Sequence, residues 1–520
     1  MSKFYEKVAY RDVEEDIKSQ KSMDKWIFRI LLIVIGFVPL IVMASVRDVQ
    51  TPLITNVDAL TGGVKGDLFT HYKALAVLIL TLIAGILFMT KILFMNGEIR
   101  KTKLNYAIGG FVIAIVLSTI FSPNISIALQ GMYNQSDGAI SWLCYLALFF
   151  IAMNIDYPKK AVNYILYALY PFVIINLFII TMNFYGDDLL QKAAVKKIVT
   201  LFLPDGANIS EGSILVGTLN QWNYMSGMFA IMTIMYLAAA ILEKNIGRAI
   251  GHLVIAVMSV AVLLMSISTS GFLTVCIMMI VVLFVAFRSE KKAQSFAMIA
   301  VFLIASAPIF HVLANKDARV WTESVGAVIK SNPYLKEEPT LSTSMNIDME
   351  FDWMKRAHAA EKFELPVLSE RGWGAGSGRI YIWSKTLNLI TERPLFGYGL
   401  DTLMYNFPHY SSDIRAAYWF EDTITDKTHN MYMGLLYGTG FVGLLSVLIL
   451  IGLSVYHPLK KAFKYNCAII CILGTAWGAY LIQAMFNDSL PGTSASMWAM
   501  AGMLLAITFK NKEQVDGRDN

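Results

Sequence analysis

Two short polar clusters stand about fifty residues apart in the longest hydrophilic stretch of an otherwise hydrophobic chain, one containing Arg379 and the other His429. An arginine guanidinium is always charged and can donate two parallel hydrogen bonds to phosphate oxygens. A histidine can accept a proton near neutral pH. The pair is therefore suited to binding a phosphate group and activating a hydroxyl, although a surface salt bridge and an interfacial histidine would use the same residue types.

The position of His429 in the chain favours a role at the membrane surface. An apolar run begins at Met431, directly after Thr428-His429-Asn430, so we expect His429 at the height of a lipid headgroup. The competing histidines of the outer segments have less informative neighbours: His71, His311, His358 and His409.

A glycine-rich run precedes Arg379. Residues 371–378 begin with Arg371 and hold four glycines in eight positions, which permits tight turns and close approach of the backbone to a ligand. The following residues predict a helix from Arg379 to about Thr391. A glycine turn that leads into a helix N-terminus can bind an anion, because free N–H groups and the helix dipole point toward it. A flexible linker is equally compatible with the glycines alone.

The composition predicts a polytopic membrane protein. Of 520 residues, 56% are hydrophobic and 16% are charged, and the mean hydropathy is +0.54. This charged fraction is well below the roughly one quarter that is typical of soluble domains. Since a helix needs about 20 mostly apolar residues to cross a bilayer, the sequence predicts twelve spans, at 26–46, 74–95, 105–121, 139–155, 161–184, 224–242, 249–267, 271–287, 296–312, 431–456, 467–486 and 495–509.

The distribution of basic residues predicts the orientation. Lys and Arg number 22 in the segments on the side of the N-terminus and 6 in the short loops opposite. Basic residues near helix ends stay in the cytoplasm, so we expect both termini there. The predicted organisation is a cytoplasmic tail at 1–25, nine helices at 26–312, a helical extracytoplasmic domain at 313–430, three helices at 431–509 and a cytoplasmic tail at 510–520. The expected fold class is all-α.

Other residue types restrict the chemistry. The four cysteines lie inside predicted helices, so neither a disulfide nor a cysteine metal site is expected. Asp422, Asp426 and His429 could form a metal site, but acidic loops are usually solvated, and we predict no metal and no cofactor. The net charge of +5 restates the asymmetry across the membrane and does not indicate nucleic-acid binding.

Four segments together carry a resemblance to a known family: 377–383, Arg393-Pro394-Leu395-Phe396-Gly397-Tyr398-Gly399, 428–430, and the apolar run 431–445. They resemble the signature region of the O-antigen ligase and polymerase family of bacterial membrane glycosyltransferases. The substrates of that family are glycans carried on polyprenyl diphosphate. The resemblance implies that His429 and Arg379 are catalytic. Arg371, Arg393 and Asn430 are further candidates for contact with the substrate.

A looser resemblance covers residues 210–290. The segment 217–227 is similar to a family loop ahead of a membrane helix, and it makes Asn223 a candidate substrate contact, although it could also be only the start of a helix. Many relatives have Ser-Arg-Gly where this chain has Ser268-Thr269-Ser270-Gly271. No arginine is present at that turn, so the missing cation must come from elsewhere, for example from Arg371.

The resemblance implies an enzyme of the bacterial cytoplasmic membrane. It would transfer or polymerise a polyprenyl-diphosphate-linked glycan on the outer face, with a glycan or lipid as acceptor and membrane lipids around it. The alternative from another class is a polysaccharide transporter or flippase, which predicts charged residues within the spans or repeat symmetry. A sensor or structural membrane protein would leave the contexts of Arg379 and His429 as coincidence.

Overall fold

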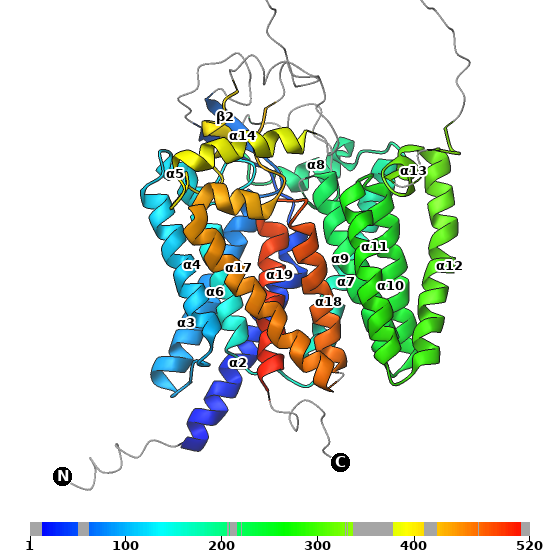
Figure 1. Cartoon of the computed structure of the whole chain (residues 1–520), viewed down its shortest axis with the longest axis horizontal. Coiled ribbons are helices and arrows are strands. Elements are labelled where there is room, and N and C mark those ends of the chain that lie inside the picture. Colours follow the sequence, from blue (N-terminus) through cyan, green and yellow to red (C-terminus); the bar gives the residue numbers. More distant parts are fainter. Residues whose placement is uncertain are drawn as a thin grey trace, which may run out of the picture.

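The computed structural model describes residues 13–49, 62–204, 207, 216–219, 221–327, 329, 331–335, 378–409, 424–465 and 467–510. Within these ranges, long helices run roughly parallel to one another (Figure 1). The long helices are α2 (Val13–Gly36), α3 (His71–Phe94), α4 (Lys103–Ile120), α6 (Ala139–Met153), α7 (Ala161–Phe184), α9 (Trp222–Leu242), α10 (Ile246–Met265), α11 (Thr269–Arg288), α12 (Lys292–Lys316), α17 (Met431–Tyr465), α18 (Ala468–Gln483) and α19 (Pro491–Phe509).

The predicted all-α membrane architecture is confirmed. Nine of the described helices are long and apolar enough to cross a bilayer, and α6 and α18 are shorter apolar helices beside them. With α2 they make twelve, one for each predicted span. Short elements lie between them: α5 (Ile125–Gln130), η3 (Leu189–Gln191), α8 (Ala193–Val199), α13 (Arg319–Thr322), η4 (Val325–Ala327), α14 (Arg379–Glu392) and α15 (Leu403–Asn406).

The predicted bounds of the first span, 26–46, were wrong. The helix begins at Val13, where Glu14, Glu15 and Asp16 in the first turn favour a helix N-terminus, and it ends at Gly36. Pro39 follows in the short helix η1 (Val38–Leu40), where it cannot continue an α-helix. The chain then forms strand β1 (Ser45–Val49), which pairs antiparallel with β2 (Gly63–Asp67). This hairpin was not expected from the sequence.

The two ends of the bundle differ in what they hold. In Figure 1, α2 begins and α19 ends at the lower end, whereas α14 and α5 lie at the upper end. This placement agrees with an even number of crossings and puts His429, at the start of α17, at the end opposite the termini. Which end faces the cytoplasm stays a prediction from the basic residues.

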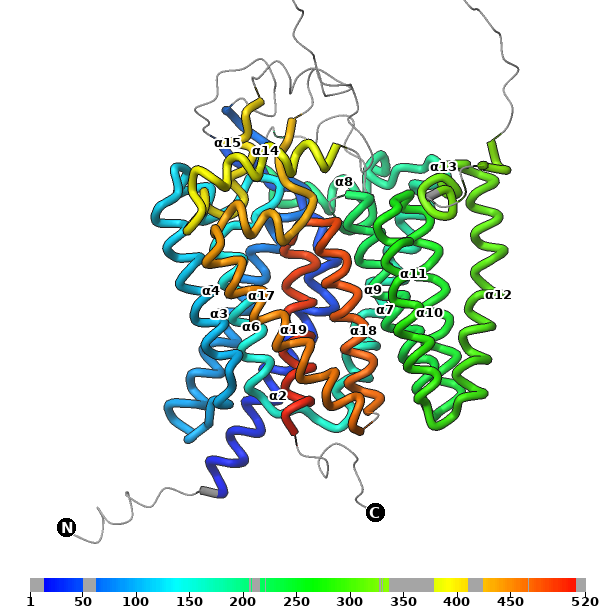
Figure 2. Tube along the Cα trace, viewed as in Figure 1, coloured from blue at the N-terminus to red at the C-terminus, as the bar shows by residue number. Residues whose placement is uncertain are grey.

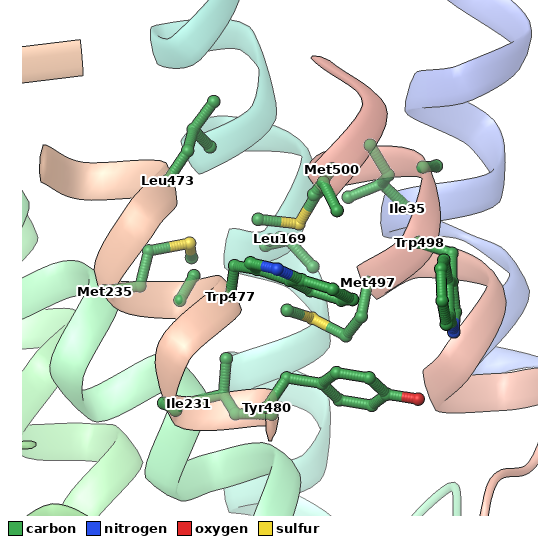
Figure 3. Packing of buried hydrophobic residues seen from close by; sticks show 14 of the residues in the cluster. Ile35, Leu169, Ile231, Met235, Leu473, Trp477, Tyr480, Met497, Trp498 and Met500 are labelled. Atoms are coloured by element: carbon green, nitrogen blue, oxygen red, sulfur yellow. The ribbon is translucent and has the colours of Figure 1, made fainter. Parts of the chain in front are cut away.

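The core lies around α9 and α19, whose spans are each 94% buried, whereas that of α12 is 22% buried. Figure 3 shows aromatic and methionine side chains of α18 and α19 filling the space beside α9. The Trp477 ring stacks on Tyr480 and meets Trp498 edge to face, each at 5.4 Å between centroids. Closely packed large side chains fix the helices that carry the site above them.

The Arg393–Gly399 motif packs against α17 where that helix is interrupted. At Gly440 the backbone leaves the helical conformation, with φ of 65°. The carbonyls of Tyr437 and Gly438 accept hydrogen bonds from the N–H groups of Tyr398 and Gly399, at 3.0 and 2.9 Å. A Cβ on Gly440 would lie 2.3 Å from a backbone oxygen of the motif, so only glycine allows this approach. The motif therefore attaches the α14 segment to α17.

Candidate functional site

His429 lies where α17 begins and α18 ends. Its backbone is left-handed, with φ of 52°, which is uncommon for a residue other than glycine. After it, Asn430 Oδ1 accepts a hydrogen bond from Met433 N at 3.0 Å, as an N-cap side chain does. Met431 N donates to Ala484 O at 2.9 Å. These contacts fix His429. They also show that Asn430, which was predicted to contact substrate, uses its side-chain oxygen to cap a helix.

Asp488 is the carboxylate beside His429, and the sequence analysis did not single it out. Its Oδ2 lies 3.7 Å from His429 Nδ1, and both atoms are buried without a hydrogen-bond partner in the described part of the chain. The other oxygen, Oδ1, is held by the Thr428 hydroxyl at 3.0 Å and by Asn430 N at 3.3 Å. The carboxylate is thus oriented with one oxygen left open toward the imidazole.

Arg379 is the first residue of α14, as predicted. Gly378 precedes it in a left-handed conformation, with φ of 77°, so a glycine is favoured at this helix start. Figure 2 shows α14 lying across the upper end of the bundle, over the first part of α17. Trp383 Nε1 donates to Thr428 O at 2.8 Å and ties α14 to the segment that holds His429.

The structure brings Arg379 and His429 into one electrostatic neighbourhood. Burial lowers the pKa of Arg379, and the charge of Asp488 opposes that shift. The guanidinium stays charged, because its ordinary pKa is far above neutrality. No ion pair joins it to a carboxylate of the described residues. A half-buried arginine without such a partner is available to an anionic ligand.

Lys427 is a second cation that the sequence analysis missed. It is 5% exposed, its Nζ lies 3.9 Å from Asp426 Oδ2, and it sits 5.0 Å from the centre of the Tyr224 ring. Burial disfavours its charge, but Tyr224, Asp426 and Asp488 outweigh burial and raise the pKa of Lys427. It therefore contributes a fixed positive charge beside His429.

The surroundings favour a neutral imidazole. Burial lowers the pKa of His429, and the positive charges of Lys427 and Arg379 lower it further. The negative charges of Asp488 and Asp426 oppose this shift. The net shift is downward, so His429 is able to accept a proton at neutral pH. With Nδ1 toward Asp488, the proton acceptor is Nε2.

A small cavity of about 50 Å³ is lined by Asp488 and by two further carboxylates, those of Asp137 and Asp401. Burial and the charge of Asp401 raise the pKa of Asp137 to about 8. Burial raises the pKa of Asp401 to about 7. Ser136 and Asp401, like His429, have positive φ, and such strained backbone is frequent near functional sites. No group of three His, Cys, Asp or Glu residues in the described ranges could hold a metal ion.

Asn223 and the turn at 268–271 are hydrogen-bonded to the end of α18 and to the segment after it, which carries Asp488. Asn223 Nδ2 donates to Asn487 Oδ1 at 2.9 Å and so links α9 to the segment that carries Asp488. At the turn that lacks an arginine, a Cβ on Gly271 would lie 2.1 Å from Ser226 Oγ. The turn thus serves as a close helix contact, and Arg379 and Lys427 are the cations whose charges lower the pKa of His429.

The other predicted residues do not join the site. Arg393 lies at the far end of α14, which is about 20 Å long for its 14 residues. There its guanidinium donates to Phe121 O at 2.9 Å and stacks over Tyr398 at 5.0 Å. Arg371 and Asp422 lie outside the described residues, as does most of the glycine-rich run.

Comparison with known families finds a match over part of the chain. Residues 254–448 match the family model described as O-antigen ligase, which supports assignment of the chain to that family. The match includes Arg379, Lys427 and His429 but ends before Asp488. No curated protein matches the chain. The family match supports a membrane enzyme of glycan ligation or polymerisation in general.

Proposed function

From the O-antigen ligase assignment of residues 254–448, we propose that the chain transfers or polymerises a polyprenyl-diphosphate-linked glycan. The reaction takes place on the outer face of the bacterial cytoplasmic membrane. The observation that carries the proposal is that an oriented histidine, His429, lies in the same charged site as Arg379, at one end of a membrane bundle. Arg379 has no carboxylate partner among the described residues. Acid–base and phosphate-binding groups are what such a transfer needs.

Arg379 acts on the leaving group in this proposal. When the bond between the anomeric carbon and the diphosphate oxygen breaks, negative charge develops on that oxygen. A guanidinium in a partly desolvated position stabilises this charge through paired N–H donors. Lys427 adds positive potential from its buried position, in place of the arginine that is absent at Ser268–Gly271.

His429 acts on the acceptor. The acceptor hydroxyl oxygen forms the new bond to the anomeric carbon, and its proton passes to His429 Nε2. Asp488 orients the ring through Nδ1 and stabilises the imidazolium that forms. Its Oδ2 is placed for this because the other oxygen is already bonded to Thr428 and Asn430.

The function is tested with the purified full-length chain. The probe is the lipid-diphosphate-linked oligosaccharide fraction extracted from bacterial membranes, incubated with the chain in detergent. We expect loss of the lipid-linked donor and appearance of transferred or lengthened glycan, with no activity in an Arg379→Lys, His429→Ala double variant. Movement of the intact donor across vesicle membranes, without new glycosidic bonds, would contradict the proposal and favour the flippase alternative.

The proposed face is tested separately by labelling in intact cells. Cysteines introduced at residues 340 and 415 should react with a membrane-impermeant reagent, and those at 290 and 462 should not. Protection of residues 340 and 415 would contradict a site on the outer face.

A further inference from the structure

A second cavity lies at the end of the molecule opposite His429. Its volume is about 560 Å³, within the range of small-molecule sites. One wall is α2, and another is the turn between α6 and α7. The lining residues that matter here are Lys21, Lys25 and Arg29 of α2, with Phe28, Tyr157 and Tyr164.

The acidic residues that line this cavity are already paired with other cations. Asp24 is buried and forms a 2.6 Å ion pair with Lys91, and its second oxygen accepts from the backbone N–H of Asp156 at 3.2 Å. The Asp156 carboxylate lies 3.2 Å from Arg100 and 3.4 Å from Lys510. Both carboxylates thus have cationic partners other than the three basic residues of α2.

Those three basic residues have no carboxylate partner in the described ranges. Lys21, Lys25 and Arg29 are four residues apart, so they lie above one another on one face of the helix. All three are exposed. The cavity therefore carries three uncompensated positive charges in a row, and it would attract an anion.

The aromatic residues place this row at a membrane surface. The Phe28 ring packs edge to face on Tyr157 at 5.4 Å, and Tyr157 belongs to the turn between two spans. Trp26 is 53% exposed, and the Arg29 guanidinium stacks over it at 4.4 Å. An exposed tryptophan beside basic residues is typical of the headgroup level of a bilayer.

We propose that this cavity binds the phosphate of an anionic phospholipid from the leaflet opposite the reaction site. The three cations match the phosphodiester and the net negative charge of the headgroup, and Phe28 and Tyr164 lie beside the acyl chains. Basic pockets between spans are known to take such headgroups. A zwitterionic phospholipid, whose own cation offsets its phosphate, is bound more weakly.

The test compares lipid retention by purified full-length protein. The chain is placed in nanodiscs of phosphatidylcholine mixed with phosphatidylglycerol, released, and examined by native mass spectrometry for bound phosphatidylglycerol. Each basic residue near the surface contributes about a fivefold gain in affinity for an anionic lipid, so the Lys21→Gln, Lys25→Gln, Arg29→Gln variant should bind roughly a hundredfold more weakly. Arg29→Gln alone should weaken binding about fivefold.

The matched control removes three exposed cations from the same end that do not line the cavity. Lys101→Gln, Lys159→Gln, Lys160→Gln should retain phosphatidylglycerol as the unchanged chain does. Equal retention by both triple variants, or equal loss from both, would overturn the proposal. So would binding of soluble glycerol 3-phosphate as tight as that of the lipid, since the site would then be one for free phosphate esters.

Discussion

The two ends of the bundle differ in whether their ionisable side chains have hydrogen-bond partners. At the end that holds the termini, Asp24 and Lys91 are both buried and 2.6 Å apart, and the second oxygen of Asp24 accepts a backbone hydrogen bond. At the other end, Asp488 Oδ2 and His429 Nδ1 face each other at 3.7 Å, and neither has a hydrogen-bond partner among the described residues.

This difference separates charges that hold the fold from charges that are open to a substrate. A buried ion pair is stable only when its hydrogen-bonding capacity is satisfied, and removing one partner is costly. Buried polar atoms left without a partner are rare and call for a functional explanation. We infer that Asp24 and Lys91 matter for stability, whereas His429, Asp488 and Arg379 matter for the reaction.

The largest expected effect on activity is that of His429→Ala. Loss of a positioned base should lower the transfer rate about 10²- to 10⁴-fold, measured with lipid-linked donor and purified protein. Thermal unfolding should change little, because His429 Nδ1 has no hydrogen-bond partner among the described residues. His429→Gln sharpens the role, since glutamine orients a hydroxyl but does not take its proton. Substantial activity in the glutamine variant would contradict proton transfer to His429.

The reverse pattern is expected for Asp24→Ala. Leaving Lys91 buried without its partner should reduce the free energy of unfolding by about 3–5 kcal/mol. Thermal or denaturant unfolding of the protein in detergent measures this change. The transfer rate of the folded fraction should stay near that of the unchanged chain. The Asp24→Ala, Lys91→Met double variant is the control, because it removes both charges and should recover most of the stability. A rate loss as large as that of His429→Ala would contradict the assignment of Asp24 and Lys91 to stability alone.

A somewhat smaller loss is expected for Arg379→Lys. The charge is kept, but the planar two-point contact with phosphate is lost, which should lower the transfer rate about a hundredfold. Arg393→Lys is the matched control at the other end of α14, where the guanidinium contacts Phe121 O. Its effect on the rate should be slight. Equal losses in the two variants would show that α14 needs both arginines for its position and that Arg379 has no specific contact with the donor.

Much of the fold could be predicted because membrane helices show in the local sequence. The apolar runs give all twelve helices, and the glycine turn before Arg379 gives the start of α14. The first span was misplaced because its hydropathy extends past Pro39, where the helix has already ended. The β1–β2 hairpin pairs residues 45–49 with residues 63–67, which are separated in the sequence, and it has no strong local signal.

The candidate site was only half predictable for a similar reason. His429 and Arg379 stand out through their neighbours in the sequence, but Asp488 comes from a segment 59 residues after His429 and meets it only through the contact of α17 with α18. Lys427 lies beside His429 in the sequence, yet only its burial between Asp426 and Tyr224 shows that its charge is fixed there. Arg393 and Asn430 were plausible by motif, and the structure shows both in contacts that stabilise the fold.

The most direct test is the pH dependence of the transfer rate in two variants that should shift the pKa of His429 in opposite directions. If neutral His429 accepts the proton, the rate rises with pH through the pKa of His429. Asp488 raises that pKa and Lys427 lowers it, so Asp488→Asn should move the acidic limb to lower pH and Lys427→Gln should move it to higher pH. Opposite displacements would support His429 as the base in this charged pocket. An acidic limb that stays in place in both variants would contradict the account.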